Sequence, residues 1–452
     1  VAAARLLWED GFSVTICLIG NEEHASEEMK KQLAIVRKLG LHICTGLPSG
    51  EYDVILDAIF GIGLSREIAG EFADAVNWIN EQDALRFAVD IPSGVNATTG
   101  EILAVAAAAD FTITFGTNKR GIVLFPGCNY AGTVIVSDIG FPKKAVEEIR
   151  PRAYTLTRQD AMELMPPRIL RSNKGSYGKV LVIAGSAEIS GACYLCAAAA
   201  GRMGSGLVKV FTAAENSTVI RTRLPEALVA TYDSTLDYSQ PENRLELSGR
   251  LQEEIKWASC IVIGPGIGTK EPAGILLTEV LKEKNKAIVI DADGLNVLSG
   301  KDEYFVERED GTRKLALSAN VVLTPHLQEM TRLTRFELPL IRARIVDQAL
   351  LALECANGQT LVLKDARTVV TDGGEVYINT TGNNALSTGG TGDVLTGMIA
   401  GLLAQGMRPK RAAVLAVCLH GIAADEYVRD RGGRYSMIAS DLLDMLPQIL
   451  PK

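Results

Sequence analysis

The sequence has few aromatic residues and no long apolar run. Phe, Trp and Tyr make up 6% of its 452 residues, which is more typical of α/β layers packed with Ala and Gly than of a β-sandwich. No stretch approaches the roughly 18 uninterrupted apolar residues that predict a membrane span. The sequence also lacks a block of Lys and Arg, and its formal net charge is −8. This charge disfavours nucleic acid as the main partner.

The cysteines do not suggest a disulfide framework. Eight are scattered along the chain, which is typical of a reducing cytoplasm. The lone C-x-x-C pair, Cys193 and Cys196, has no second pair or adjacent His, so it predicts buried helix cysteines rather than a zinc site. Residues 1–8 resemble the middle of a helix and lack the parts of a signal peptide. We therefore expect a cytoplasmic protein whose start is truncated.

The length, composition and strand–helix alternation of the sequence predict two α/β domains. Its length suggests two or three domains, and 47% hydrophobic with 22% charged residues indicates a globular protein with sizeable cores. We place the domains at 1–150 and 151–452, with a linker near 145–160 where charges and prolines gather. Both halves alternate strands and helices, which predicts parallel sheets with ligand sites at the carboxyl ends of the strands.

The expected elements follow from buried runs and periodic segments. In the first half we expect helices at 26–39 and 71–82 and strands at 14–19, 52–58, 86–90, 111–115 and 133–136. In the second half we expect strands within 178–186 and at 261–263, 287–290, 321–323 and 361–363. Residues 233–251 are polar and predict a surface excursion.

One glycine-rich segment gives the clearest sign of chemistry. In residues 383–397, small residues run into an apolar helical segment, and Asp393 lies at the junction. Glycines let backbone N–H groups gather around an anion, and a helix start adds about half a positive charge. A carboxylate there makes sense if it removes a proton from a hydroxyl that attacks phosphorus. Taken alone, the segment fits equally well an Asp that caps a helix.

Further polar loops follow predicted strands. In the second half these are the loop 264–268, Asp291-Ala292-Asp293 and Thr324-Pro325-His326. In the first half Asp57 and Asp90 end strands, and each has a glycine four residues further on. Such loops are where an open α/β sheet places its active site.

These motifs together resemble a known enzyme family. Residues 173–186, the loops after the second-half strands, Glu329 and the glycine-rich segment resemble, in this order, the carbohydrate-kinase-like domain of NAD(P)H-hydrate repair enzymes. Residues 57–63 and 89–94 resemble their epimerase domain. The similarity covers nearly the whole chain. It implies an α/β protein with a Rossmann-like three-layer first half, incomplete at its start, and a ribokinase-like α/β/α second half.

The resemblance implies repair of a nicotinamide cofactor that has taken up water. The hydrate carries a hydroxyl on C6; hydroxide is a poor leaving group, whereas the ring nitrogen's lone pair can expel phosphate. Similarity to bacterial members implies ADP as the donor, giving AMP and phosphate, with Mg²⁺ bridging the phosphoryl groups. Asp393 would be the base, and the N–H groups of Gly389 to Gly392 would bind the anion.

The family pattern also implies individual contacts. The hydrate would contact Ala192, Gly268, His326 and Asp393, and AMP would contact Lys364, Asp365, Ala366, Arg367, Thr368 and Gly392. Asp365 departs from the usual glycine and would alter the surroundings of the phosphate; Leu327-Gln328 replaces the common Pro-Gly. His326 alone is more typical of a loop histidine, and Lys364 alone of a solvated lysine. The shared series of motifs favours function for both.

In the first half, the pattern implies an epimerase that interconverts the R and S hydrates. K⁺ would be held by Asp57 and Ser93, Asp90 would be an acid/base group, and substrate phosphates would lie along Gly61, Ile62, Gly63, Leu64, Ser65, Arg66 and Glu67. The structural alternative is a tight turn with Asp90 as a cap. The family's Asn-Asn-Gly-Gly-Asp-Gly loop would lie just before Val1 and is absent from this sequence. Either the start is missing or this half does not epimerise, because the lost loop removes several charge-assisted hydrogen bonds.

Two other functions remain open at this point. Another ribokinase-like kinase, acting on a hydroxymethylpyrimidine or a hydroxyethylthiazole, would share the glycine-rich segment and the base but release a stable phosphoester. In the second alternative the first half is a binding or assembly module without catalysis, and the absent phosphate loop is in its favour. The expected partners are the hydrates of NADH and NADPH, ADP, and further copies of the chain in a homotetramer or larger assembly. No pocket for a 2′-phosphate can be identified, so both hydrates remain candidates.

Overall fold

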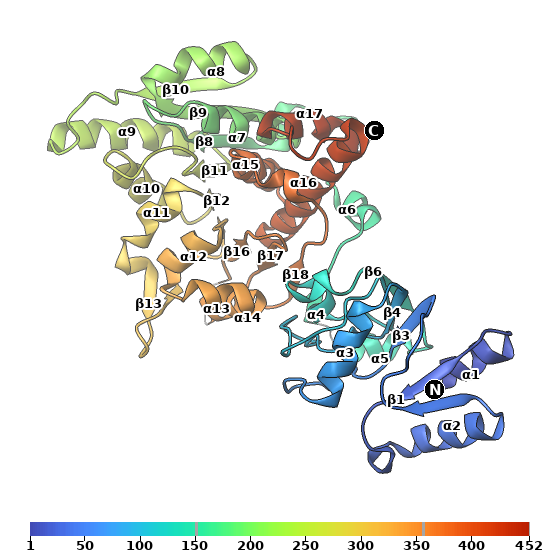
Figure 1. The fold of residues 1–452 in the computed structure, drawn as a ribbon. Coiled ribbons are helices and arrows are strands. Elements are labelled where there is room, and N and C mark those ends of the chain that lie inside the picture. The colour runs from blue at the N-terminus through green and yellow to red at the C-terminus, as the bar shows by residue number, and fades with distance from the viewer. Residues whose placement is uncertain (150–151, 355–357, 452) are drawn as a thin grey trace. The chain divides into compact units, whose positions relative to one another are not determined.

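The structure, a computed structural model, describes residues 1–149, 152–354 and 358–451. The chain divides into two compact units, Val1–Ile149 and Arg150–Lys452, and each is described by itself (Figure 1). The domain boundary that we expected between residues 150 and 151 lies outside the described residues. Within the described ranges, no helix is both long enough and apolar enough to cross a membrane.

The first unit contains two parallel sheets rather than the single sheet suggested by its sequence. Strands β1 (Thr15–Leu18) and β2 (His42–Thr45) pair with each other. Helix α1 (Ala2–Glu9) precedes β1, and α2 (Glu27–Lys38) lies between β1 and β2 in the sequence. The second sheet has the order β3-β4-β5-β6, and its strands are β3 (Val54–Asp57), β4 (Leu85–Val89), β5 (Phe111–Phe115) and β6 (Thr133–Ser137). The remaining helices are α3 (Glu71–Glu81), α4 (Arg120–Val123) and α5 (Lys143–Ile149). A strand's residue pattern identifies the strand but not its neighbours, which is why the division was missed.

The second unit is built on one sheet of ten strands. The order is β10-β9-β8-β11-β12-β15-β16-β17-β18-β7. Neighbouring strands from β10 to β16 are parallel, whereas β17 is antiparallel to both β16 and β18. The strands are β7 (Ala153–Tyr154), β8 (Lys179–Ile183), β9 (Leu207–Ala213), β10 (Leu228–Tyr232), β11 (Cys260–Ile263), β12 (Ala287–Ile290), β15 (Val321–Leu323), β16 (Thr360–Leu363), β17 (Val369–Thr371) and β18 (Val376–Ile378). A separate hairpin joins β13 (Phe305–Glu307) to β14 (Arg313–Leu315).

Helices cover both faces of this sheet. Alternate strand residues such as Val180, Val262 and Val322 share one core with the helices α7 (Gly191–Arg202), α15 (Thr391–Ala404), α16 (Pro409–Arg431) and α17 (Ala439–Ile449). Successive strand residues point to opposite faces, so the residues between them face the other helices. These are α9 (Pro241–Trp257), α10 (Ala273–Leu281) and α14 (Ile345–Ala352). Shorter helices are α6 (Arg158–Leu164), α8 (Ser217–Arg223), α11 (Asp293–Ser299), α12 (Leu327–Thr334) and α13 (Leu338–Ala343).

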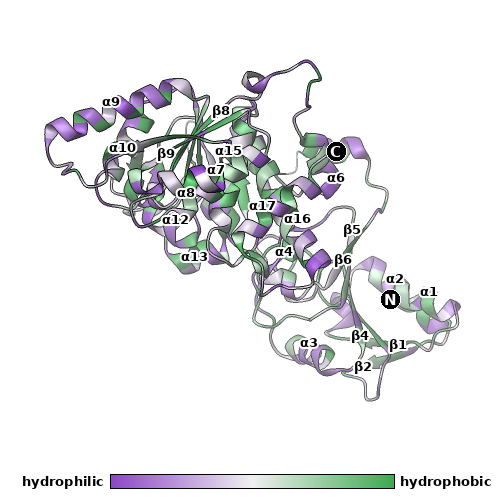
Figure 2. Cartoon of the chain, turned by 90° about the horizontal axis from the view of Figure 1, so that it is seen from above, coloured by the Kyte–Doolittle hydropathy of each residue, from purple (hydrophilic) through white to green (hydrophobic). Residues whose placement is uncertain are grey.

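Helix α9 corrects one expectation. Residues 233–251 were expected to form a polar surface excursion, yet most of α9 lies there. Leu247, Leu251 and Ile255 are its buried residues, and their spacing of four places them on one stripe. Figure 2 shows many hydrophilic residues along the rest of this helix. So narrow an apolar stripe was easily overlooked in a polar segment.

Candidate active site

The glycine-rich segment ends at the beginning of α15. Gly390 is the residue before the first helical one, with φ of 92°, and no side chain caps the helix. Glycine adopts such a φ with little strain. Thr391 Oγ1 donates to the carbonyls of Leu386 and Thr388, at 2.9 and 3.0 Å, which secures the turn. The Thr391 N–H donates to the Thr388 carbonyl at 3.4 Å, whereas the N–H groups of Gly392 and Asp393, which have no acceptor within the helix, are available to an anion.

His420 of α16 supports this turn from inside the core. Its Nε2 lies 3.0 Å from the Thr391 carbonyl oxygen, and burial lowers the pKa of His420 to about 4. The ring is therefore neutral at physiological pH, so Nε2 can donate to that carbonyl and Nδ1 carries no proton.

Helix α7 packs closely against α15. A Cβ atom added to Gly397 would lie 2.1 Å from the Cys196 carbonyl oxygen, and one added to Gly401 would lie 2.7 Å from the Ala200 carbonyl oxygen. The two helices therefore run in the same direction and in step. Four residues before Gly397 and Cys196, which is about one turn of each helix, the same pairing places Asp393 opposite Ala192. Two of the expected hydrate-contacting residues thus lie together.

A buried ion pair lies at the carboxyl ends of β12 and β16. Lys364 Nζ is 2.8 Å from Asp291 Oδ1, and Thr396 Oγ1 donates to Asp291 Oδ2 at 2.7 Å. Burial by itself would raise the pKa of Asp291, but Lys364 and the hydroxyl donors hold it below its usual value. A Cβ atom added to Gly392 would lie 3.5 Å from Lys364 Nζ. The ammonium group therefore lies against the backbone of the glycine-rich segment.

Asp393 is a half-buried carboxyl whose pKa is raised. Burial raises the pKa of Asp393 to about 7; Asp291 and Asp293 add to the effect, while Lys364 opposes it. A base is most effective when its pKa is close to the working pH. Gly390 occupies the capping position of α15 and no side chain caps the helix, so the structure does not support Asp393 as a helix cap.

His326 begins α12 in a fixed orientation. Its Nδ1 accepts hydrogen bonds from the N–H groups of Gln328 and Glu329 at 3.1 and 3.2 Å, and Glu329 Oε2 accepts from the His326 N–H at 2.8 Å. This reciprocal arrangement leaves the proton of the neutral ring on Nε2. Burial lowers the pKa of His326, and burial raises the pKa of Glu329 to about 7. The segment before α12 lies next to the Lys364–Asp291 ion pair, because the Lys364 N–H donates to the Pro325 carbonyl at 2.8 Å.

The loop 264–268 closes the same edge of the sheet. Gly264 has φ of 131°, and a Cβ atom there would lie 1.8 Å from the Asp291 carbonyl oxygen. Only glycine allows the loops after β11 and β12 to approach so closely. The Gly268 N–H donates to Asp293 Oδ2 at 2.9 Å, and a Cβ atom on Gly266 would lie 3.1 Å from Ala192 Cβ. Ala192 and Gly268 therefore belong to the edge that carries Asp393.

The expected nucleotide-contacting residues 364–368 form the turn between β16 and β17. Thr368 Oγ1 donates to the Asp365 carbonyl at 3.1 Å, and Arg367 Nη1 lies 3.5 Å from the Thr380 carbonyl oxygen. Asp365 and Ala366 are exposed at the tip of the turn. The structure thus brings Lys364 and Gly392 together, while Asp365 and Ala366 are open to solvent and Arg367 and Thr368 are half-buried.

In the first unit, Asp57 and Ser93 are in direct contact. Asp57 is 2% exposed; its Oδ1 accepts from Ser93 Oγ at 2.6 Å and its Oδ2 from the Ser93 N–H at 2.7 Å. Burial raises the pKa of Asp57 despite these bonds. Gly94 follows with φ of 95°, and a Cβ atom there would lie 1.9 Å from the Val105 carbonyl oxygen. The position of Ser93 therefore depends on a glycine that nothing larger can replace.

Asp90 has a partner that the sequence did not reveal. Lys119 Nζ lies 2.5 Å from Asp90 Oδ1, which also accepts from Thr114 Oγ1 and the Phe115 N–H, both at 3.1 Å. Burial opposes ionisation, but these donors hold the pKa of Asp90 below its usual value. The carboxylate is therefore charged at neutral pH. Residues 61–67 lie in a largely exposed loop, in which only Leu64 is half-buried.

Comparisons with known proteins identify relatives of both halves of the chain. A family model described as NAD(P)H-hydrate dehydratase matches residues 180–448, and one described as YjeF-related protein N-terminus matches residues 1–121. The bifunctional NAD(P)H-hydrate repair enzyme Nnr of Thermofilum pendens is 35% identical over 464 residues, covering 100% of this chain and 84% of the relative. The chain belongs to the bifunctional NAD(P)H-hydrate repair enzyme family. The predicted family, and its enzymatic nature, are thereby confirmed.

Solved structures support the fold of the second unit. A ribokinase-like superfamily protein from Enterococcus faecalis is 28% identical with a TM-score of 0.55, covering 66% of this chain and 94% of that protein. The ADP/ATP-dependent NAD(P)H-hydrate dehydratase from Bacillus subtilis, co-crystallized with ATP and Mg²⁺, is 29% identical with a TM-score of 0.51, covering 65% and 96%. These neighbours confirm the ribokinase-like prediction, and the parallel sheets of the first unit agree with a Rossmann-like fold.

Metal ligands are sparse in both units. Among the residues that the structure describes, no group of three or more His, Cys, Asp and Glu side chains is placed to hold a metal ion. Asp291 and Asp293 nevertheless both raise the pKa of Asp393, and Lys364 opposes them. Such an excess of negative charge suits a cation whose other ligands come from a bound phosphate.

Proposed function

We propose that the second unit is an ADP-dependent dehydratase that converts (6S)-NAD(P)H hydrate to NAD(P)H, with release of AMP and phosphate. The observation that carries this proposal is the Asp393 carboxyl, with a pKa of about 7, at the beginning of α15 beside the Lys364–Asp291 pair. A base and an anion-binding helix start are together what transfer of a phosphoryl group to an alcohol requires.

The proposed reaction has two steps. Asp393 takes the proton of the C6 hydroxyl while that oxygen attacks the terminal phosphorus of ADP; the new O–P bond forms and the bond to AMP breaks. The lone pair of the ring nitrogen then expels phosphate from C6, and loss of a proton from C5 restores the double bond. His326 Nε2–H, held at the sheet edge by the capping of Nδ1, would orient the hydrate.

Charges around the phosphates would come from several groups. Lys364 and the N–H groups of Gly389, Gly390 and Gly392 would bind phosphoryl oxygens, because donors preorganised around developing charge stabilise the transition state. Asp293 is the carboxylate that would attract Mg²⁺, whose remaining ligands would be phosphate oxygens and water. Bound there, Mg²⁺ would neutralise charge on the transferring group.

We propose epimerisation of the R and S hydrates as the function of the first unit. Asp90, kept ionised by Lys119, would be its acid/base group, and the exposed loop 61–67 would contact substrate phosphates. Asp57 and Ser93 fit K⁺, because a carboxylate that is 2% exposed receives only hydrogen bonds from Ser93 and Ile59 among the described residues. A cation there would compensate a charge that burial disfavours.

A single assay tests the dehydratase against a simple kinase. The full chain is incubated with NADH hydrate, ADP and Mg²⁺, and absorbance of reduced cofactor is followed together with AMP and phosphate. The proposal expects one equivalent of each product per hydrate consumed. Accumulation of a stable phosphoester without reduced cofactor would instead favour the ribokinase-like kinase. The cytoplasmic location and the homo-oligomer remain predictions.

A further inference from the structure

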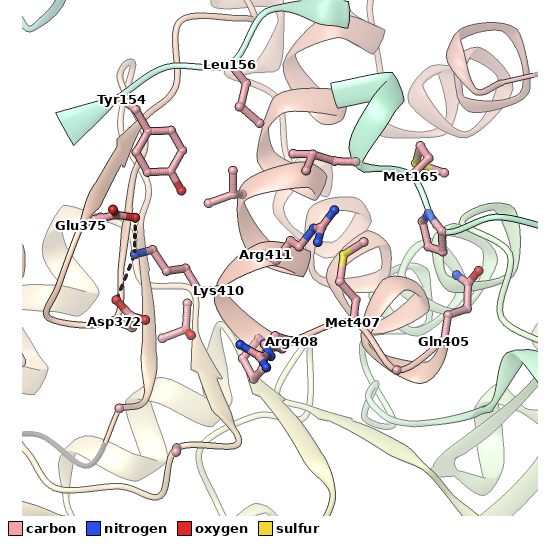
Figure 3. Close-up of a pocket in the computed structure, with 18 of the residues that line it drawn as sticks. Tyr154, Leu156, Met165, Asp372, Glu375, Gln405, Met407, Arg408, Lys410 and Arg411 are labelled. Carbon is pink, nitrogen blue, oxygen red and sulfur yellow. Dashed lines mark hydrogen bonds and ion pairs between the residues drawn. The ribbon is translucent and has the colours of Figure 1, made fainter. Parts of the chain in front are cut away.

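Helix α16 packs beside the glycine-rich segment, although none of its residues takes part in the proposed reaction. Residues 412–424 are all buried, and most of them share one core with α15. At the start of α16, Figure 3 shows Lys410 pointing to Asp372 and Glu375, and its Nζ lies 3.1 and 3.9 Å from their carboxylate oxygens. These acidic residues lie in the turn between β17 and β18. Because β17 is antiparallel to β16, this turn lies at the end of the sheet away from Lys364. α16 is therefore fixed to the sheet independently of the segment beside it.

Asp425 follows the buried part of α16 and binds the first residues of the glycine-rich segment. The residue is exposed. Its Oδ2 accepts from the Gly382 N–H and its Oδ1 from Asn383 Nδ2, both at 2.8 Å. The chain lies directly against the helix here, since a Cβ atom added to Gly382 would lie 3.2 Å from Gly421 Cα. Hydrogen bonds to a carboxylate are stronger than those between neutral groups. Asp425 therefore holds the start of the segment through both of its oxygens.

Side chains of the segment connect this contact to the glycines. Asn383 Oδ1 accepts from the Ala385 N–H at 3.0 Å and caps the one-turn 3₁₀ helix that follows. Thr388 Oγ1 donates to the Ala385 carbonyl of that turn at 3.1 Å. Thr391 Oγ1 donates to the Leu386 carbonyl at 2.9 Å. The two threonines lie on either side of the two adjacent glycines, so the direction of the glycine N–H groups depends on where the 3₁₀ turn is held.

The glycines themselves have little else to hold them. A Cβ atom added to Gly389 would meet no atom within 4 Å, and glycine has more backbone freedom than any other residue. Beyond the glycines, the segment is held by His420 of α16, whose Nε2 lies 3.0 Å from the Thr391 carbonyl oxygen. The glycines therefore lie between two contacts with the same helix, Asp425 at one end and His420 at the other.

We propose that Asp425 is a positioning residue, which aligns the glycine-rich segment for phosphoryl transfer through Asn383. This inference rests on the proposed function of the second unit. Asp425 touches neither ADP nor the hydrate. It acts by keeping the glycine N–H groups aimed at the phosphoryl oxygens, where charge develops in the transition state. Interactions that are stronger in the transition state than in the ground state affect kcat rather than substrate binding.

A double-mutant cycle on Asn383 and Asp425 tests the proposal. Asp425→Asn brings two amide NH₂ groups together, and Asn383→Asp brings two carboxylates together, so each single variant loses the contact between the two side chains. In Asn383→Asp/Asp425→Asn the donor and the acceptor exchange places, and the net charge is unchanged. The amide oxygen at position 425 can still accept from the Gly382 N–H, and the carboxylate at position 383 from the Ala385 N–H. Every hydrogen bond of the native arrangement is thereby restored.

The rate is measured on the full chain with the S hydrate of NADH, ADP and Mg²⁺. We expect each single variant to lower kcat by about five-fold or more and to change the KM for ADP by less than about two-fold, as loss of a transition-state interaction requires. The double variant should recover most of the lost kcat. Asp430→Asn, which changes another exposed carboxyl of α16, is the matched control and should follow the unaltered protein. Single variants with the unaltered kcat, or a double variant no faster than the single ones, would overturn the assignment.

Two further results separate positioning from loss of folded protein and from failure of the proposed function. Calorimetry should find as many ADP sites per chain in the single variants as in the unaltered protein; a decrease in proportion to the lost rate would make Asp425 merely structural. If the unaltered protein accumulates a phosphoester in place of reduced cofactor, the dehydratase proposal fails. The same cycle is then measured on the rate of phosphoester formation, where the same loss and recovery are expected and their absence would overturn the assignment.

Discussion

Lys364 Nζ lies 2.8 Å from Asp291 Oδ1, although 73 positions separate the two residues in the chain. The pair joins the ends of β12 and β16 and lies against Gly392 of the glycine-rich segment. It therefore has two consequences: it holds the edge of the sheet together, and it places a cation beside the proposed phosphoryl site.

Removing the lysine should destabilise the second unit strongly. Lys364→Met leaves the Asp291 carboxylate buried without its partner, and breaking such a pair costs about 3–5 kcal/mol. The control is Lys30→Met, which breaks an ion pair with Glu27 in which the two side chains are 41% and 76% exposed; it should cost about 1 kcal/mol or less. Urea unfolding of both variants measures the difference. Similar decreases in the free energy of unfolding of the two variants would show that the Lys364–Asp291 pair contributes no more than a surface ion pair.

The Asp393 carboxyl predicts a pH-dependent stability. Its pKa is raised from 3.8 to about 7 in the folded chain, so between these values the folded state binds more protons than the unfolded state. Stability must then fall as pH rises through this window, and the full penalty is present above pH 7. Asp393→Asn removes it and should be more stable than the unaltered protein by about 4 kcal/mol at pH 8, with little difference near pH 4.

Thermal or urea unfolding at several pH values checks this prediction without any substrate. Asp365→Asn, which changes an exposed carboxyl at the same sheet edge, serves as the control and should follow the unaltered protein. A constant difference between Asp393→Asn and the unaltered protein from pH 4 to pH 8 would exclude the raised pKa.

The close approach of α7 and α15 should tolerate no added methyl group. Gly397→Ala would place Cβ 2.1 Å from the Cys196 carbonyl oxygen, and the resulting overpacking costs about 1–3 kcal/mol. In Gly249→Ala the new Cβ meets nothing within 4 Å on the surface of α9, so the better helix propensity of Ala should stabilise that variant by up to about 1 kcal/mol. The free energy of unfolding should therefore decrease in Gly397→Ala and increase in Gly249→Ala, relative to the unaltered protein. A stabilised Gly397→Ala would contradict the close approach of α7 and α15.

Lys119 should control the pH range of epimerisation. Removing the ammonium in Lys119→Met raises the pKa of Asp90, so the acid limb of the pH profile for interconversion of the R and S hydrates should shift to higher pH. Lys143→Met, which changes an exposed residue of α5, should leave the profile in place. Chromatography of the two hydrates at several pH values measures it. An unshifted profile in Lys119→Met would remove Asp90 as the titrating group.

Much of the fold could be predicted because buried strands have simple signatures. The strands at 111–115, 287–290 and 321–323 were predicted with the bounds that the structure has. The last two are apolar runs, and the first alternates threonine with Phe and Ile. β17 and β18 have three residues each and pass almost directly into turns, so no run marks them. α9 was hidden because only three of its residues are buried.

The site was predictable in its members but not in all of its contacts. Asp393, Lys364, His326 and Gly268 were named from motifs, and the structure places them at one sheet edge. The Asp291–Lys364 contact depends on β15 lying between β12 and β16, and strand order is not written in local residue patterns. The Lys119–Asp90 pair was missed for the same reason, because it joins residues that follow different strands.

The most direct test of the central claim is the dehydratase rate of Asp393→Asn, measured with ADP and with ATP as donor. Calorimetry should first show that the variant still binds ADP, so that any loss concerns chemistry rather than binding. Loss of a general base typically lowers the rate by about 10²–10⁴-fold, and we predict a decrease of this size with whichever donor the unaltered protein uses. An Asp393→Asn variant that forms NADH from the S hydrate at the unaltered rate would contradict the account.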